Sequence, residues 1–323
     1  MIPLSSRNKK IIGGVSLSII LIYIVVSFFS YNQSVLIKTY QGESHLEEEK
    51  QNGSFDTTLL AEVNREDFTV DSDYGYQLKG SYLKVSNEQF PLTVIMVHGV
   101  THDRWRMMRY AQIYLKNGID VVLYDHRKHG LSGGNEVSFS YFESRDLEKI
   151  VQWTKQKKPS DIIAAHGESL GAATVCSHSG INETTHSVNF YISDCAFSDT
   201  KNLLVLRAKE DFGMPNIGFV DTTSLLAKIR AGFYFADASP IKGIRQSKVP
   251  VLFIHGKADT YIPMEMSQEL YDAKSQGAKF IWFVDKAEHA RSITTAPVEY
   301  EKKVMNYIHT MMTQLLSKQN LPI

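Results

Sequence analysis

Unbroken apolar runs alternate with mixed stretches through most of the chain after residue 65. The run at residues 92–97, LTVIMV, is apolar throughout, which is typical of a strand buried on both faces of a parallel sheet. Because strands alternate with helices, we expect an α/β fold with a mostly parallel, eight-stranded sheet flanked by helices, in which the first two strands pair antiparallel. The predicted strands are residues 68–70, 76–85, 92–97, 120–124, 161–165, 188–193, 249–255 and 279–284, and the predicted helices are residues 105–117, 141–157, 170–179, 264–276 and 298–317.

The run at residues 11–29 carries no charge over 19 residues, about the length that crosses a bilayer as a helix. Basic residues precede it and acidic residues follow it, so the positive-inside rule places residues 1–10 in the cytoplasm and the remaining chain outside the cell membrane. A cleaved signal peptide, with secretion of the rest, is the alternative. Signal peptides usually have a shorter apolar region, and residues 27–31 form a poor cleavage site. We therefore expect a transmembrane signal-anchor.

The rest of the chain divides into a linker and one large domain. Residues 30–64 are polar and acidic and are interpreted as a linker, and residues 65–323 form the domain. Within it, residues 198–247 break the alternation with aromatic-rich helical sequence, which we interpret as a small helical cap. Its aromatic and aliphatic content suits an apolar pocket.

Composition excludes several classes of protein. The 323 residues have a net charge of +0 and are 43% hydrophobic, which argues against a disordered chain and against many membrane spans. No extended basic patch indicates a nucleic-acid partner. Cys176 and Cys195 are interpreted as buried apolar thiols, and a disulfide between them stays open. The sequence predicts no metal and no cofactor, and it leaves the oligomeric state open.

The segment at residues 164–172 places Ser169 between Gly167 and Gly171, directly after an apolar run and before a predicted helix. This is the context of a nucleophile elbow, in which a buried strand turns sharply into a helix with the serine at the apex. Glycines flank the serine because so tight a backbone leaves no room for Cβ atoms. A structural serine in an ordinary turn is the simpler alternative, but strand, glycines and helix all agree with the elbow.

A serine hydroxyl needs a neighbouring base, and the base needs a carboxylate that orients it. In this kind of sheet the expected order is serine, acid, histidine, each in a loop after a strand. The chain supplies Asp259 after one predicted strand and His289 after the next. Asp259 as a helix cap, Asp285 as a rival acid and His289 as a surface histidine are the alternatives.

An oxyanion needs two fixed backbone donors, for which we expect the amides of Leu170 and Val100. His98 and the pair His126 and His129 are interpreted as structural histidines that hold loops. The predicted helix after Val100 and its start carry three arginines, Arg104, Arg106 and Arg109. They either attract an anionic substrate or lipid headgroup or form a solvated helix face, and we prefer the solvated face.

These motifs resemble the α/β-hydrolase fold serine hydrolases over residues 66–316, and are similar to the Bem46-like and bacterial cell-surface hydrolase branch. The matching segments are residues 98–99, 125–132, 167–171, 255–259 and His289. The resemblance implies a triad of Ser169, His289 and Asp259. Lys128 stands where the family commonly has glycine, which concerns the shape of a loop.

Together these predictions describe a membrane-anchored serine hydrolase. We expect a carboxylesterase that cleaves small hydrophobic acyl esters through an acyl-enzyme intermediate, with membrane attachment through residues 11–29. A serine peptidase or amidase, or an acyltransferase that uses the same triad, is the first alternative. A non-catalytic surface binding module is the second, and the intact set of three residues weighs against it.

Overall fold

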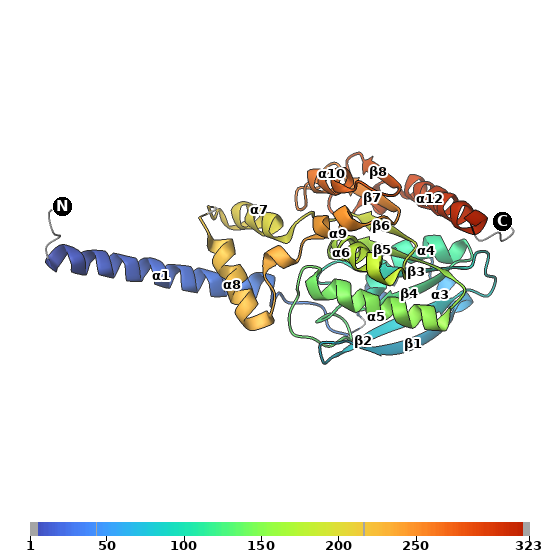
Figure 1. The fold of residues 1–323 in the computed structure, drawn as a ribbon. Coiled ribbons are helices and arrows are strands. Elements are labelled where there is room, and N and C mark those ends of the chain that lie inside the picture. The colour runs from blue at the N-terminus through green and yellow to red at the C-terminus, as the bar shows by residue number, and fades with distance from the viewer. Residues whose placement is uncertain (1–5, 43, 216, 319–323) are drawn as a thin grey trace.

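The computed structural model describes residues 6–42, 44–215 and 217–318, and it is built around one eight-stranded sheet (Figure 1). The strand order is β1-β2-β4-β3-β5-β6-β7-β8. The strands are β1 (Asn64–Asp71), β2 (Gln77–Lys84), β3 (Leu92–Val97), β4 (Asp120–Tyr124), β5 (Ile162–Glu168), β6 (Phe190–Asp194), β7 (Val251–Gly256) and β8 (Lys279–Val284).

The sheet is mostly parallel, as predicted. β2 pairs antiparallel with β1 and with β4, whereas the strands from β3 to β8 pair in parallel with their neighbours. Every residue of β3, β5 and β7 is buried, which explains why these strands are continuous apolar runs. Because parallel strands end at the same edge, the loops after β3, β5, β7 and β8 meet there.

Helices cover both faces of this sheet, and each face has its own apolar cluster. On one face α4 (Met108–Lys116) and α12 (Pro297–Lys318) pack against the sheet. On the other face lie α5 (Tyr141–Lys157), α6 (Leu170–Thr185) and α10 (Met264–Ala273). Before α4, residues 104–107 form the 3-10 helix η1 (Arg104–Met107), in which the Asp103 side chain accepts a hydrogen bond from the Trp105 amide.

The segment at residues 30–64 is not the free linker that its polarity predicts, because it packs along the domain. Its helices are α2 (Ser44–Gln51) and α3 (Leu59–Glu62). Gln41 pairs with Gly130, and the Thr39 hydroxyl donates to the Lys128 carbonyl. The buried Glu49 carboxylate accepts hydrogen bonds from Arg106 and Arg109.

The predicted solvated face of arginines is therefore wrong as well. Arg106 and Arg109 pair with Glu49, and Arg104 forms a buried ion pair with Asp125. A buried guanidinium group needs a partner of opposite charge, since desolvation without one costs several kcal/mol, on the order estimated for single buried ions. The acidic segment supplies one of these partners.

The N-terminal helix α1 (Ser6–Ser34) projects from the domain (Figure 1). It is the one helix of the described residues that is long and apolar enough to cross a membrane, judged by length and composition. Its last turns contact α8 (Phe219–Ala231), where the Ser27 hydroxyl donates to the Thr222 hydroxyl over 2.6 Å.

The insertion at residues 198–247 has two parts rather than one cap. Its first part holds α7 (Thr200–Phe212), α8 and the start of a short 3-10 helix η2 (Phe235–Asp237), and it lies beside α1 (Figure 1). Its last part, α9 (Pro240–Gln246), belongs to the main domain, because it packs closely on α6. A Cβ atom on Gly243 would lie 2.4 Å from the Cys176 carbonyl oxygen. We use the name cap for residues 200–235.

Candidate active site

The turn between β5 and α6 holds Ser169 in a strained conformation, with φ at +55°. Such a value is uncommon for a residue with a side chain and marks a position that its surroundings enforce. A Cβ atom on Gly167 would lie 2.2 Å from the Gly171 carbonyl oxygen, and one on Gly171 would lie 1.9 Å from the Val97 carbonyl oxygen. Both glycines are therefore required by close backbone contacts, which is the geometry of a nucleophile elbow.

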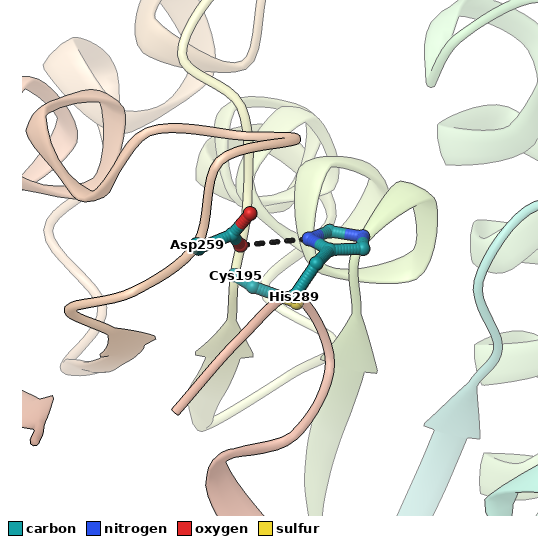
Figure 2. Close-up of side chains that lie close together, drawn as sticks. All are labelled: Cys195, Asp259 and His289. Carbon is teal, nitrogen blue, oxygen red and sulfur yellow. Dashed lines mark hydrogen bonds and ion pairs between the residues drawn. The ribbon is translucent and has the colours of Figure 1, made fainter. Parts of the chain in front are cut away.

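The structure brings the three predicted side chains together, although 120 residues separate Ser169 from His289. The Ser169 Oγ atom lies 2.9 Å from His289 Nε2, and His289 Nδ1 lies 2.7 Å from Asp259 Oδ2. Figure 2 shows the Asp259 carboxylate facing the edge of the imidazole ring. A proton on Nδ1 that donates to the carboxylate leaves the Nε2 lone pair to accept the serine proton.

The Asp259 carboxylate is held in its ionised form. Burial alone raises its pKa, but hydrogen bonds from His255 and His289 and from the Ile262 amide outweigh this effect and lower the pKa to about 2. The His255 Nε2 atom lies 3.1 Å from Asp259 Oδ2 and 2.8 Å from the Ile262 carbonyl oxygen. The sequence placed His255 next to the acid in the segment 255–259 but indicated no role for it.

The alternatives to this acid and base do not lie in the site. Asp285 is exposed, and its carboxylate pairs with Lys257 over 2.6 Å. His309, the one other histidine after Asp259 in the sequence, lies on α12, where its ring contacts Phe90.

The loop after β3 lies directly against the serine. A Cβ atom on Gly99 would lie 3.5 Å from Ser169 Cβ and 3.0 Å from Glu168 Oε1. Within the described parts of the chain, neither the Val100 amide nor the Leu170 amide donates a hydrogen bond. Two unpaired amides beside a nucleophile are what the stabilisation of an oxyanion requires.

The rings of two buried histidines, His98 and His129, hold this loop from behind. His98 donates from Nδ1 to the Gly99 carbonyl over 2.7 Å and accepts from the His126 amide at Nε2. His129 accepts from the Thr101 amide at Nε2 over 3.1 Å. Burial lowers the pKa of His98 and of His129 to about 3, so both rings are neutral and act as hydrogen-bond partners. These positions agree with the predicted structural role.

Cys195 lies beside the triad, as Figure 2 shows, and one ligand atom each of Cys195, Asp259 and His289 lie within 4.8 Å of one another. Burial raises the pKa of the Cys195 thiol, which favours the protonated form, whereas metal binding requires a thiolate. Both cysteines of the chain are free and buried, as predicted.

A cavity of about 280 Å³ lies between the site, the cap and the end of α1. Val100 and Tyr261 line it on the catalytic side, and the Tyr261 ring lies 5.1 Å from the His289 ring. The apolar part of its remaining lining comes from distant segments, namely Phe29, Ile37, Phe139, Leu204, Ala208, Phe212, Met214, Val220 and Phe235. The polar part comprises Ser30, Gln33, Ser34, Arg207, Asp211 and Thr223.

Comparison with known proteins identifies the family. The family model described as serine aminopeptidase, S33, matches residues 90–204. The chain is 33% identical to the uncharacterised protein YqkD of Bacillus subtilis over 307 residues, which cover 94% of this chain and 98% of that protein. It is 25% identical to the acylamino-acid-releasing enzyme of Rattus norvegicus, of which it covers 31%, over 69% of its own length.

Solved structures share the fold. The esterase Pf2001 of Pyrococcus furiosus superposes with a TM-score of 0.64 at 23% identity, covering 80% of this chain and 95% of the esterase. The acylaminoacyl peptidase of Pyrococcus horikoshii superposes with a TM-score of 0.57 at 17% identity, covering 79% of this chain and 42% of the peptidase. The narrower Bem46-like branch stays a prediction. At full length and in its fold, the chain belongs to the α/β-hydrolase family of serine hydrolases.

Proposed function

We propose that this protein is a membrane-anchored carboxylesterase that cleaves hydrophobic acyl esters with Ser169, His289 and Asp259 as its catalytic triad. The observation that carries the proposal is the continuous chain of two hydrogen bonds from the Ser169 hydroxyl through His289 to Asp259. The strained backbone at Ser169 supports it, because strained backbone positions cluster at functional sites.

In the proposed reaction the Ser169 oxygen attacks the ester carbonyl carbon while His289 Nε2 takes the hydroxyl proton. The amides of Val100 and Leu170 stabilise the negative oxygen of the tetrahedral intermediate. His289 then gives the proton to the leaving alcohol, and an acyl-enzyme remains on Ser169. Water then attacks the carbonyl carbon of the acyl-enzyme, with His289 as the base, and the carboxylic acid is released as the Ser169 hydroxyl is restored.

The apolar lining of the cavity favours an ester with a hydrophobic acyl group over a peptide. Similar proteins named as an acylamino-acid-releasing enzyme and as an acylaminoacyl peptidase keep a second candidate open, since the triad itself suits an ester or a peptide bond. We propose further that α1 is a signal-anchor, with the N-terminus in the cytoplasm and the catalytic domain outside. The uncharged run at residues 11–29 and the basic residues before it support this orientation.

The test uses the full-length protein in detergent and a fluorophosphonate probe, which labels activated serines. We expect Ser169→Ala to abolish labelling and His289→Ala to lower kcat on p-nitrophenyl butyrate by about 10⁴-fold or more. Ser317→Ala and His309→Ala, at exposed positions on α12, are the matched controls and are expected to keep wild-type values.

A series of p-nitrophenyl esters of increasing chain length, run beside aminoacyl p-nitroanilides, separates esterase from peptidase. Turnover that rises with chain length supports the esterase, whereas turnover of anilides alone points to the peptidase. Labelling of Ser169→Ala equal to that of the wild type would contradict the triad, and absence of both labelling and turnover in the wild type would favour a binding module.

A further inference from the structure

The cap exposes large apolar side chains to a degree that the rest of the folded domain does not. Phe212, Ile217 and Leu225 are each more than half exposed, and Ile229 is 73% exposed. Among the described residues outside α1, the other exposed aliphatic or phenylalanine side chains are scattered singly, at Leu131, Phe280 and Val298. A gathered apolar surface marks a site of interaction, whereas single exposed residues are ordinary.

This surface is continuous with the apolar helix α1. The Tyr23 hydroxyl donates to the Ile217 carbonyl over 2.5 Å, and the Tyr23 ring lies 4.6 Å from the Phe219 ring. Leu225 and Ile229 line an apolar groove between the two helices, together with isoleucines of α1 at positions 19, 20 and 24. Whatever solvates α1 therefore also contacts the outer face of α8.

The contact lies at a depth that a bilayer would occupy. Tyr23 precedes the end of the uncharged run by six residues, which in a helix is about 9 Å. The connection between α7 and α8 meets α1 at this level, and residues 212–220 carry no charged side chain. A spanning α1 would thus carry the tip of the cap below the surface of the membrane.

A cationic side chain lies higher, where α1 leaves the apolar run. The Arg230 guanidinium lies 5.9 Å from the Phe28 ring and 5.5 Å from the Tyr31 ring. Arginine and tyrosine are the residues that anchor membrane proteins at the level of the lipid headgroups. The apolar side chains of the groove would lie at the level of the acyl chains, and Arg230 at the level of the headgroups, of one leaflet.

The active-site cavity opens toward the same surface. Phe212, Met214 and Val220 line the cavity and belong to the α7–α8 region that contacts α1, and Phe29 of α1 lines it too. At its other end the cavity reaches Val100, next to the proposed nucleophile. An acyl chain that enters between α1 and the cap would run toward Val100, in the loop that lies against Ser169.

We propose that the cap inserts into the leaflet beside α1 and that the substrate is an acyl-ester lipid, which enters the active site sideways from the bilayer. This inference rests on the proposed function and names its substrate class. The occupant of the apolar surface is the acyl region of the membrane, because the surface continues α1 and shares its depth. Water-soluble short esters bypass the cap and reach Ser169 without the membrane.

The test places the full-length protein in nanodiscs of phosphatidylethanolamine and phosphatidylglycerol that contain a fluorogenic long-chain acylglycerol. We expect Leu225→Glu and Ile229→Glu to lower hydrolysis of the lipid by about ten-fold, since a charge is costly within the apolar layer. Both variants are expected to keep wild-type turnover of p-nitrophenyl butyrate. Phe280→Glu and Val298→Glu, at exposed apolar positions away from the cap, are expected to change neither activity.

Equal loss of lipid hydrolysis in the cap variants and the controls would overturn the inference, as would full lipid activity in all of them. A wild-type protein that shows neither fluorophosphonate labelling nor butyrate turnover would instead contradict the proposed function, so the two failures can be distinguished.

A second measurement does not depend on activity. Because Cys176 and Cys195 are buried, a fluorophore reacts selectively with the cysteine of Leu225→Cys or of Val298→Cys. We expect lipids with nitroxide groups on their acyl chains to quench the label at position 225 and to leave the label at position 298 bright. Equal quenching at both positions would contradict insertion of the cap.

Discussion

The Asp259 carboxylate shows how neighbouring groups fix one residue in the orientation and charge that its proposed role needs. The Tyr261 and Ile262 amides donate to its Oδ1 atom over 3.0 and 2.8 Å, and His255 and His289 contact Oδ2. Four contacts fix the carboxylate in orientation and keep its pKa near 2. The acid is therefore charged over the whole range in which an imidazole accepts protons.

Replacement of this carboxylate has a defined consequence. We expect Asp259→Asn to lower kcat on p-nitrophenyl butyrate by about 10⁴-fold, because the amide favours the wrong tautomer of His289. Asp285→Asn is the matched control and is expected to keep wild-type kcat, since Asp285 is exposed and pairs with Lys257. Steady-state kinetics with both variants checks this. A comparable loss in Asp285→Asn alone would assign the acid to Asp285.

Asp194, at the end of β6, has a raised pKa, in contrast to Asp259. It is fully buried, and burial raises its pKa to about 7 from its usual 3.8, although hydroxyls of Tyr300 and Ser292 donate to it. A carboxyl group whose pKa is higher in the folded state stabilises the fold at low pH. That contribution is lost as the pH rises from about 4 to about 7.

We therefore expect Asp194→Asn to remove part of this pH dependence. As the pH rises from 4 to 8, the free energy of unfolding of the wild type should fall by about 2–4 kcal/mol more than that of the variant, because the asparagine does not titrate. Denaturant unfolding in detergent at both pH values measures the difference. Asp285→Asn serves as the exposed control. An equal dependence in wild type and Asp194→Asn would show that Asp194 does not titrate in this range.

At the scale of elements, the contact between α2 and the start of α4 carries an ionic cluster. The Arg109 Nη2 atom lies 2.8 Å from Glu49 Oε1, and Arg106 contacts the same oxygen. Glu49 is buried, so loss of its charge removes the ion pair of Arg109 and leaves Arg106 with Glu48, whose Oε1 atom lies 3.6 Å away. This cluster fastens the segment before β1 to the domain.

We expect Glu49→Gln to lower the free energy of unfolding by about 3–5 kcal/mol, the usual cost of breaking a buried ion pair on one side. Glu47→Gln is the control, because Glu47 is exposed on the same helix and pairs only with Lys50 among the described residues. Thermal unfolding in detergent compares the two variants. A Glu49→Gln protein as stable as Glu47→Gln would show that the cluster is not stabilising.

The same elements show what sequence patterns can predict. The bounds of β3, β4, β8 and α5 agree with the prediction, because burial on one or two faces leaves a local periodic signal. The proximity of Ser169, Asp259 and His289 was predictable because each follows such a strand. Contacts between distant residues leave no local signal, so the packing of residues 30–64 and the role of His255 were not predictable. α9 was assigned to the cap for the same reason.

On the scale of the whole molecule, three segments far apart in sequence meet around one cavity. The end of α1, the loop after β3 and the cap each contribute lining residues. The domain alone supplies the three proposed triad residues, but residues of α1 form part of the cavity lining. The N-terminal helix and the domain therefore form one packed structural unit.

The pairing of residues 39–42 with the domain has a further consequence. Gly42 and Gly130 are joined by a hydrogen bond of 2.9 Å, and the Tyr40 amide donates to the Thr101 carbonyl. The chain that leaves α1 is thus fixed to the loops near Ser169 within a few residues, which restricts rotation between the helix and the domain. In the membrane arrangement proposed above, Ser169 would therefore keep a constant height above the bilayer. In that arrangement we expect the protein to select esters by the depth of the ester bond in the lipid.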